Sequence, residues 1–445
     1  MKPHFIVKTH EPVAAMAKVP YWGETIGTPD QLPSLFMPAL DKILGHYRLP
    51  IRMSHEYPRA RPAQPWSPAE IRQGLNRIYR FILQDKGTLP DKMLRRIRLL
   101  PEVRYIRLGD IAVTDLPHSH SITTADYTLQ QSKSTDRQSR QAIGLDRAHL
   151  TTKGSGRITV AVLDTGVDLS HGELSHTYLP GRDFVNIIDG ADRFLGDFLG
   201  YDSEPADLYV GHGTHVAGII AGHGKAMPQG VAPACRILPV RVLGAMRRGD
   251  TTVGAGLLDN INVGLKWAID AGADVINMSL GVRASGGGLP YKELIDYARD
   301  KNVTIVAASG NNGSEDLYYP GAYPYVITVG ALSRNQEQVA PFSTYGKQVD
   351  IVAPGSEIYS SFLGNSYAFS SGTSQAAPFV AGSVALLKSY ALEQGAILDD
   401  NKIKYLLKHT SDKMGRPYKD AKAGYGKLNI ADAMQLLKNK LSRRG

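Results

Sequence analysis

The segment ITVAVLDTGVD, residues 158–168, places an almost unbroken apolar run directly before an acidic turn. Such a run, without polar alternation, suits a strand that is covered on both faces of a parallel sheet. Four further short apolar runs lie at residues 237–243, 275–278, 303–308 and 326–329. Helical patterns separate or follow them at residues 213–222, 253–271, 291–301 and 372–394. This alternation predicts an α/β fold with a mostly parallel central sheet flanked by helices.

The N-terminal part of the chain differs in its composition and its pattern of apolar residues. It is rich in proline, and Ser67-Pro68 has the form of a helix N-cap followed by proline at the first helical position. The helix predicted there carries apolar Ile71, Leu75, Ile78, Tyr79 and Ile82 and ends at Gly87 and Pro90. A second helix at 91–100 and an edge-type strand at 103–107 complete a predicted smaller α+β domain. We therefore expect three parts: residues 1–115, a polar linker and possible processing region at 116–140, and the α/β domain at 141–445.

The composition excludes several classes of protein. The 445 residues include 51 Lys and Arg against 42 Asp and Glu, a net charge of +9. Residues 1–140 hold 21 basic and 13 acidic side chains, which leaves a net charge of +1 for the remainder. Ordinary apolar and glycine contents exclude a coiled coil or a collagen, and no apolar run is long enough for a membrane-spanning helix. The opening MKPHFIVKTH has no signal-peptide core and the single Cys235 fits a reducing compartment, so a cytoplasmic location is expected, with secretion left open.

Three segments place a chemically active residue beside glycines at an element boundary. They are LDTGVD with Asp164, GHGTHVAGIIAG with His212, and SGTSQAAPFVAG with Ser374. A serine hydroxyl needs a neighbouring base to act as a nucleophile, and a carboxylate can orient that base. Ser374 at a helix start would also present backbone N–H groups to a developing oxyanion. The three residues together indicate a nucleophile, its base and a carboxylate that orients the base without being protonated itself.

Each of these residues also has a simpler interpretation. Asp164 alone could be a turn residue, and Ser374 alone could be a helix cap. His212 and His215 could share one helical face around a metal ion, although no third ligand is evident nearby. The occurrence of all three segments in one chain, in the order Asp, His, Ser, favours the catalytic interpretation.

In these motifs the chain resembles the subtilisin family of serine peptidases, over residues 141–433. The resemblance extends to VAASGNNG at 306–313, where it implies that Asn311 forms the oxyanion hole with the Ser374 N–H. It implies that Ser279, Leu280 and Gly281 in INMSLG pair with an extended substrate, opposite a wall at 248–250. The other substrate-binding residues that it implies are Ala307, Ala308, Gly310 and Tyr318, the last near the base of a specificity pocket.

The N-terminal part ends in a segment, Leu89–Asp110, that resembles the last helix and strand of the propeptides of this family. The resemblance implies a zymogen whose N-terminal region acts as an intramolecular inhibitor or folding chaperone. An accessory domain is the alternative. The charge of +8 on residues 1–140 suggests an acidic partner surface, and we expect that surface in the acid-rich segment between Asp164 and His212.

The same acid-rich segment has three interpretations. It is a solvated surface insertion, a structural calcium site of the kind common in the family, or an acidic rim that selects basic substrates. No defined calcium loop is spelled out in it. The triad chemistry itself requires no cofactor.

The leading functional hypothesis is a serine endopeptidase that acts on peptides or proteins through an acyl-enzyme and processes its own N-terminal region. A peptide ligase or macrocyclase that uses the same acyl-enzyme is the close alternative. A binding protein that uses the basic N-terminal region is the alternative from another class. No nucleic-acid motif supports the last hypothesis, so neither nucleic acid nor membrane is expected as a partner.

Overall fold

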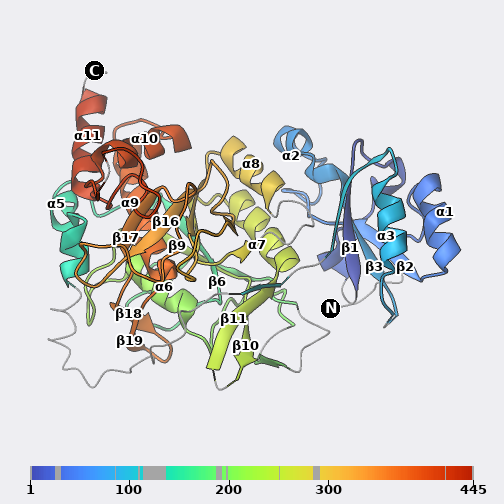
Figure 1. Cartoon of the computed structure of the whole chain (residues 1–445), viewed down its shortest axis with the longest axis horizontal. Helices are drawn as coiled ribbons and strands as arrows, with labels where there is room; N and C mark the ends of the chain where they lie inside the picture. The colour runs from blue at the N-terminus through green and yellow to red at the C-terminus, as the bar shows by residue number, and fades with distance from the viewer. Residues whose placement is uncertain are drawn as a thin grey trace.

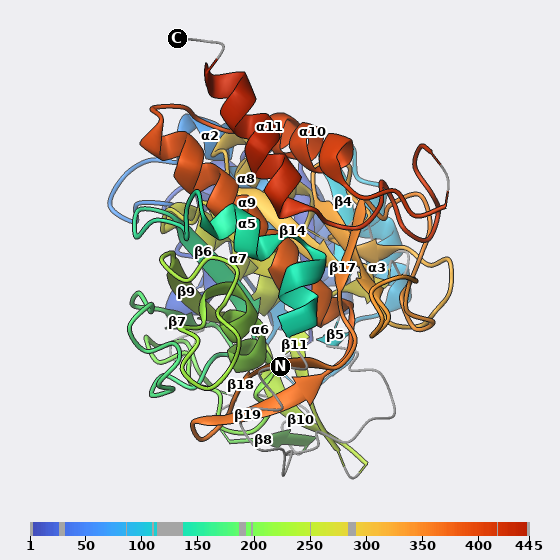
Figure 2. The ribbon, with the colours of Figure 1, turned by 90° about the vertical axis from the view of Figure 1, so that its left-hand side faces the viewer.

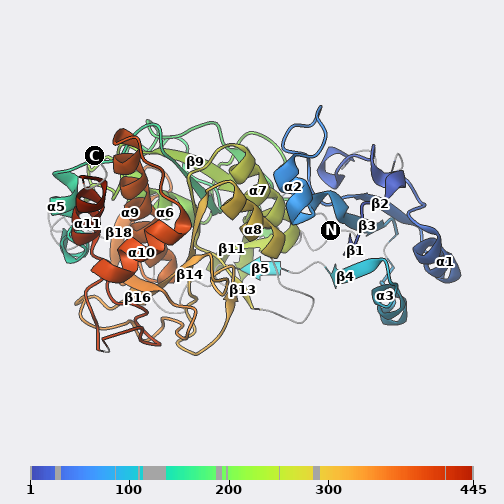
Figure 3. The ribbon, with the colours of Figure 1, turned by 90° about the horizontal axis from the view of Figure 1, so that it is seen from above.

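The computed structural model describes residues 3–25, 32–85, 87–108, 111–113, 137–186, 193–196, 199–249, 251–283, 291–415 and 417–442, without the side chains of 111–113, 251 and 283. The elements form successive layers along the long axis of the molecule (Figures 1 and 3). Helices α9 and α6 lie on one face of a central sheet, and α7 and α8 lie on the other. A separate N-terminal sheet stacks outside α7 and α8, with α1 and α3 beyond it.

The central sheet has seven strands in the order β17-β16-β14-β12-β6-β9-β7, and its paired strands run parallel. Their bounds are β6 Thr159–Asp164, β7 Arg182–Asp183, β9 Arg236–Arg241, β12 Val275–Met278, β14 Thr304–Ala308, β16 Ile327–Leu332 and β17 Ile351–Pro354. The five strands predicted from apolar runs all belong to it. Because the strands are parallel, the residues that follow them gather at one edge of the sheet.

The helices of this domain cover both faces of the sheet. They are α5 Leu145–His149, α6 His212–Ala221, α7 Leu258–Asp270, α8 Lys292–Asp300, α9 Thr373–Glu393, α10 Asp400–Thr410 and α11 Ile430–Ser442. The predicted α/β fold is confirmed. One boundary was wrong: the helix predicted from residue 253 begins at Leu258, because residues 251–257 form strand β11. Gly256 allows that strand to approach the carbonyl of Val242, which a Cβ would meet at 2.3 Å.

The N-terminal sheet is antiparallel and has the order β2-β3-β1-β4. Its elements are β1 His4–Thr9, α1 Pro38–Tyr47, β2 Ile51–His55, α2 Pro68–Gln73, β3 Ile78–Leu83, α3 Asp91–Arg98 and β4 Val103–Leu108. Alternate side chains of β1 face opposite ways: Phe5 and Val7 join the core with α1 and α3, and Ile6 joins the core with α7. The sheet is therefore buried on both faces.

The long helix predicted after Ser67 was wrong beyond its first turns. The Ser67–Glu70 capping box is present, but α2 ends at Gly74, which has a φ of 69°. The chain then pairs as β3 between β1 and β2. Ile78 packs in the core on one face of the sheet and Tyr79 in the core on the other face. The apolar residues that suggested a helix therefore belong to a strand. The helix predicted at 91–100 and the edge strand predicted after it are present as α3 and β4.

A third sheet, of four strands, links the N-terminal region to the α/β domain. It has the order β5-β11-β10-β8, formed by Ile111–Val113, Thr251–Leu257, Gly244–Arg248 and Phe194–Leu195. Two antiparallel pairs complete the strands: β13 Val282–Arg283 with β15 Tyr318–Tyr319, which are distant in sequence, and the hairpin of β18 Ile358–Phe362 with β19 Ser366–Ser370. None of the helices in the described ranges combines the length and the apolar character that crossing a bilayer requires.

Candidate active site

Asp164 and His212 meet at the carboxyl edge of the central sheet. Asp164 is the last residue of β6, and His212 is the first residue of α6, which follows an αL turn at Gly211. Nδ1 of His212 lies 2.7 Å from Oδ1 of Asp164, and both side chains are buried. Because a carboxylate only accepts hydrogen bonds, Nδ1 carries the proton and Nε2 of the neutral ring is left with a lone pair.

The electrostatics of the pair favour a basic imidazole. Burial alone lowers the pKa of His212, because a buried cation loses its hydration. The charge and hydrogen bond of Asp164 and the charge of Asp207 oppose this effect, and the pKa of His212 ends above its ordinary value. The ring is therefore a stronger proton acceptor than burial alone would allow.

Ser374 lies in the first turn of α9, which packs against α6. Its Oγ donates a hydrogen bond of 3.1 Å to the carbonyl of Ser279, and Oγ of Ser279 donates one of 2.8 Å to the carbonyl of Ser374. Within the described residues, Nε2 of His212 has no hydrogen-bond partner. The hydroxyl of the nucleophile candidate thus bonds to the backbone beside β12, and no hydrogen bond joins it to Nε2 of His212.

Asn311 follows β14 and is anchored by its side-chain oxygen. That oxygen accepts hydrogen bonds from the backbone N–H of Thr373 at 2.8 Å and from the Thr373 hydroxyl at 2.9 Å. The assignment of the amide oxygen follows from these two donors, so the NH₂ group lies on the other side of the amide. A Cβ at Gly372 would lie 3.4 Å from that nitrogen, which places it beside the turn that carries Ser374.

The predicted substrate-binding residues lie around the same edge of the sheet. Ser279, Leu280 and Gly281 follow β12, while Ala307 and Ala308 end β14 and are buried. Gly310 has a φ of 107°, and a Cβ there would meet the ring of Tyr318 at 2.8 Å. Tyr318 therefore covers Gly310 from strand β15. In the wall predicted at 248–250, Arg248 ends β10, and residue 250 lies outside the described residues.

The side chain of His215 makes structural contacts with the β18–β19 hairpin. Its Nε2 lies 3.1 Å from the carbonyl oxygens of both Ile358 and Ala368, which makes that nitrogen a donor. Burial lowers the pKa of His215 to about 3. These contacts hold the ring through Nε2, and His212 and His215 belong to no group of three or more His, Cys, Asp or Glu side chains among the described residues that could hold a metal ion.

The acid-rich segment before His212 is used largely for internal hydrogen bonds. Glu173 accepts the backbone N–H groups of residues 224–226, and Asp183 pairs with Arg241. Among the described residues, no group of three or more His, Cys, Asp or Glu side chains could hold a metal ion. The acids at 189, 192 and 197 lie outside those residues. Glu173 and Asp183 are thus buried rather than solvated, and the calcium interpretation stays a prediction.

Sequence analysis missed Asp207, which organises the turn that carries His212. This buried carboxylate accepts four hydrogen bonds, from the N–H groups of Tyr209, Val210 and Gly211 and from the hydroxyl of Thr165. Thr165 Oγ in turn accepts from the N–H of Gly213, so the carboxylate braces the backbone on both sides of His212. The signal in the sequence, an Asp five residues before the histidine, was weak because it sits among many other acids.

We expect Asp207→Asn to shift the acid limb of the pH profile of kcat/KM to lower pH. The substitution removes a negative charge that raises the pKa of His212, and only the neutral ring can accept the serine proton. It also turns an NH₂ group toward backbone donors, which should lower the free energy of unfolding by about 2 kcal/mol. Asp202→Asn, an exposed carboxylate that caps Glu204 N–H, is the matched control. An acid limb identical to that of the wild type would contradict the role given to Asp207.

Comparison with known proteins assigns the chain to a protein family. The model of the subtilase family matches residues 155–426, a range that contains all three triad candidates and Asn311. The chain belongs to the subtilase family. The thermophilic serine proteinase of Bacillus sp. (strain AK1) is 40% identical over 294 residues, which is 65% of this chain and 64% of that protein, so the match spans slightly less than two thirds of that relative.

Other subtilases show the same similarity. The major intracellular serine protease of Bacillus subtilis (strain 168) is 39% identical over 242 residues, 53% of this chain and 70% of that protein. The structure of a protease from Pseudoalteromonas arctica PAMC 21717 superimposes with a TM-score of 0.56 at 31% identity, covering 66% of this chain and 94% of that one. These similarities concern the α/β domain, and the relatives named here are proteases. The N-terminal sheet lies outside the residues that the family model matches.

Proposed function

We propose that this subtilase hydrolyses peptide bonds with Asp164, His212 and Ser374 as its catalytic triad. The observation that carries the proposal is the 2.7 Å contact between His212 and Asp164, beside the helix that begins at Thr373. Rotation of the Ser374 hydroxyl toward Nε2 of His212 completes the triad. His212 then takes the serine proton and returns it to the leaving amine, while Asp164 stabilises the imidazolium.

The oxyanion of the tetrahedral intermediate would be held by Asn311 and the Ser374 N–H. The hydrogen bonds from Thr373 fix the Asn311 amide before the reaction, so no reorganisation is needed when charge develops. The substrate would lie as an extended strand along Ser279–Gly281, between that edge and β11. Ala307, Ala308, Gly310 and Tyr318 would line its specificity pocket. All of these steps use side chains of the chain alone, so we propose that the chemistry requires no cofactor; a structural calcium ion stays a prediction.

The mass of the product decides between hydrolysis and ligation. A peptide that is cut by water yields fragments whose summed mass exceeds that of the peptide by one water molecule. A ligase or macrocyclase would instead return a linear or cyclic product without that gain. We expect hydrolysis, and a cyclic product as the main species would favour the ligase alternative.

We further propose that the N-terminal region is the intramolecular inhibitor of this site. Its last described strand, β5, pairs antiparallel with β11 and lies beside β13, which follows the proposed substrate edge. Such a strand occupies the place where an extended substrate would add. Self-processing would remove the region by a cut in the linker at 116–140, most of which lies outside the described residues.

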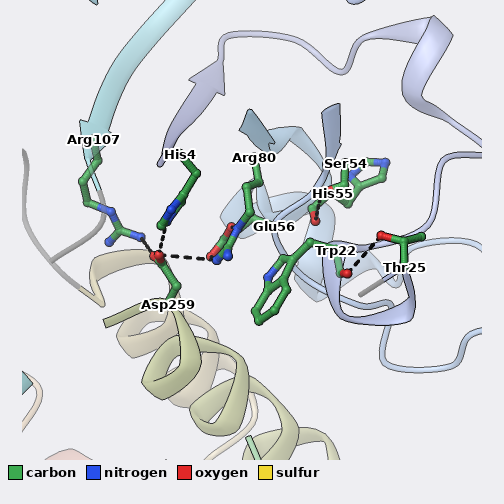
Figure 4. A network of polar contacts seen from close by, with 9 residues as sticks. All are labelled: His4, Trp22, Thr25, Ser54, His55, Glu56, Arg80, Arg107 and Asp259. Carbon is green, nitrogen blue, oxygen red and sulfur yellow. Dashed lines mark hydrogen bonds and ion pairs between the residues drawn. The ribbon is translucent and has the colours of Figure 1, made fainter. Parts of the chain in front are cut away.

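A buried ionic cluster joins the N-terminal sheet to α7 (Figure 4). Asp259, in the first turn of α7, lies 2.5 Å from Nε2 of His4, 3.2 Å from Arg107 and 3.5 Å from Arg80. Glu56 lies 2.9 Å from Arg80 within the N-terminal region. Burial would raise the pKa of Asp259, but the surrounding cations outweigh it and hold that pKa below its usual range.

The same interface contains further ion pairs with α7 and α8. Lys8 pairs with Glu293 at 2.8 Å, and buried Lys266 of α7 pairs with Glu70 of α2 at 2.8 Å. Among the described residues, the carboxylates of the α/β domain that pair with this basic region include Asp259 of α7 and Glu293 of α8, whereas sequence analysis expected them before His212. The segment before His212 meets that region through aromatic rings instead, with Tyr201 against Tyr21 and Trp22.

We expect Asp259→Asn to loosen the N-terminal sheet. The substitution leaves His4, Arg80 and Arg107 buried without their shared carboxylate, and loss of one partner of a buried ion pair costs about 3–5 kcal/mol. In a chain that also carries Ser374→Ala, which prevents self-cleavage, amide exchange in β1 and β4 should accelerate by about 10²–10³-fold while that in α9 stays unchanged. Arg72→Ala, which removes the half-exposed pair with Asp300, should have at most a small effect. Unchanged amide exchange in the Asp259→Asn variant would show that this ionic cluster does not hold the N-terminal sheet to α7.

We propose a cytoplasmic location. The single cysteine is a buried thiol with its Sγ 3.6 Å from Oγ of Ser389, and no disulfide constrains the described residues. The relative from Bacillus subtilis is named an intracellular protease. Fractionation of cells that produce the chain would test this, and recovery of the active enzyme from the medium would contradict it.

A further inference from the structure

The α/β domain is strongly polarised in charge. Residues 141–400 hold 18 basic and 26 acidic side chains, a net charge of −8, while the last 45 residues hold 12 basic and 3 acidic side chains, a net charge of +9. The net charge of residues 141–445 is therefore close to zero because the charges of these two regions, which have opposite signs, cancel. Charge separated in this way creates local fields that attract partners of one sign to one part of the surface.

The basic residues gather at the end of the molecule that is farthest from the N-terminal sheet. Helices α10 and α11 lie at that end of the long axis in Figure 1, and they lie side by side when the molecule is viewed from there (Figure 2). The chain between them, residues 411–429, returns to the edge strand β17, to which residue 427 bridges. This arrangement brings lysines of α10 and of the following loop onto one surface.

We call this the lysine surface; it comprises Lys404, Lys408, Lys413, Lys419, Lys422 and Lys427. Three of its ammonium groups lie over the ring of Tyr425, at 5.0 Å for Lys408, 5.9 Å for Lys413 and 5.2 Å for Lys419. A fourth, that of Lys422, lies 5.5 Å from the centre of the Tyr345 ring. Like charges held this close repel one another, and the ring faces offset only part of that repulsion.

The acidic side chains nearby neutralise only part of the surface. Asp350 lies 3.1 Å from Lys404 and 3.4 Å from Lys419, and Asp412 lies 3.6 Å from Lys427. Asp420 accepts the N–H groups of residues 422 and 423. Six lysines thus face three carboxylates. Lys408 and Lys422 are exposed and rest on tyrosine rings, so their charges are available to a bound anion.

A cavity of about 360 Å³ opens within the lysine surface. Its walls include Asp350, Lys404, Tyr405, Lys408 and Tyr425, with the starts of β16 and β17 behind them. The cavity is large enough for one or two side chains. The surface therefore combines positive charge with a recess that a partner can enter.

We propose that the lysine surface is an exosite that binds acidic segments of polypeptide substrates. This inference rests on the proposed peptidase function, because the surface would raise the local concentration of such substrates at the triad. The rest of the domain, with a net charge of −8, repels an acidic polypeptide. An acidic segment would therefore be held and oriented at this one place.

The side chains favour a polypeptide over nucleic acid or lipid. The Tyr425 ring that could stack on a base is instead contacted by the ammonium groups of three lysines. Among the described residues near the lysine surface, the exposed large hydrophobic side chains are Tyr405, Tyr418 and the single aliphatic Ile397, which is less apolar area than a helix that inserts into a bilayer presents.

The separation from the triad sets the length of substrate that can use both sites. The cavity lies at the amino ends of β16 and β17, whereas Asp164 and Asn311 lie at the carboxyl ends of parallel strands. Strands of 4–6 residues that rise about 3.3 Å per residue separate the two sites by at least about 13–20 Å. A flexible linker of about 12 residues has a matching average span of about 20 Å.

The test compares two fluorogenic peptides that share one neutral cleavage core and a Gly/Ser linker of about 12 residues. One ends in eight glutamates and the other in eight glutamines. At low ionic strength we expect kcat/KM of the processed enzyme to be about tenfold higher for the glutamate peptide. The ratio should fall to about threefold or less in the Lys408→Gln, Lys422→Gln double variant. It should persist in Lys153→Gln, Arg157→Gln, which loses the same charge from exposed positions ahead of β6.

A binding measurement separates this proposal from the peptidase function. Fluorescence anisotropy of the labelled glutamate peptide with the Ser374→Ala chain reports binding without cleavage, and the double variant should bind it several-fold more weakly. Cleavage of the glutamine peptide reports the peptidase function alone. Equal kcat/KM for both peptides, or a ratio unchanged in the double variant, would overturn the exosite. So would binding of single-stranded DNA or phosphatidylserine vesicles that depends on these lysines while the glutamate peptide does not bind.

Discussion

Replacing Ser374 by alanine is expected to lower kcat for a peptide substrate by about 10⁶-fold, with little change in folding. The side chain lies in the first turn of α9, where its hydroxyl contacts only the carbonyl of Ser279 among the bonds described, so its loss removes the nucleophile and one hydrogen bond. Initial rates of hydrolysis measure the effect, and thermal unfolding checks that the fold is intact.

The residual activity of this variant is informative. The oxyanion hole and the substrate edge would still bind the substrate, so a rate above that of water alone is expected. Ser279→Ala serves as the matched control, because it removes the neighbouring hydroxyl that bonds the Ser374 carbonyl. A Ser374→Ala chain with activity within tenfold of the wild type would show that another group is the nucleophile.

Replacing Asp164 by alanine is expected to lower kcat by about 10⁴-fold. The carboxylate holds the His212 ring by its 2.7 Å contact and outweighs the effect of burial on the pKa of that ring. Without it, burial lowers the pKa of His212, and the imidazolium formed during the reaction loses its counter-charge. The measurement is the pH profile of kcat, whose acid limb should move to lower pH as the rate falls.

The direction of that shift separates two explanations. A purely structural defect would lower kcat at every pH without moving the acid limb of the profile. Loss of the negative charge must move that limb to lower pH. Asp202→Ala, at an exposed position of the same domain, should change neither the rate nor the limb. A limb that moves to higher pH in the Asp164 variant would contradict the electrostatic role.

Much of the α/β domain could be predicted because its signals are local. The apolar runs that became β6, β9, β12, β14 and β16 form strands that are buried except at the first residues of β6 and β9, and such strands need no long-range information to be recognised. Asp164, His212 and Ser374 could be proposed as a triad because each stands in a glycine-rich turn whose backbone must approach another element. At Gly213, for example, a Cβ would meet the carbonyl of Gly166 at 2.1 Å.

What could not be predicted depends on contacts that are distant in sequence. Residues 78–83 have apolar side chains at helical spacing, yet pairing with β1 and β2 makes them a strand. Asp259 carries no local sign that it would receive His4, which lies 255 positions away. The charge of residues 401–445 was concealed by averaging it with the acidic 141–400, and only the folded chain shows that its lysines converge on Tyr425.

The central claim is that Ser374 is an activated nucleophile in a cleft that the N-terminal region covers. Intact-mass spectrometry after treatment with a fluorophosphonate tests it most directly, applied to the wild type and to Ser374→Ala. We predict one adduct on wild-type chain that has lost roughly its first 110–140 residues, and no adduct and no such loss in the variant. Processed wild-type chain that takes up no label, or a Ser374→Ala chain that is labelled equally, would contradict the account.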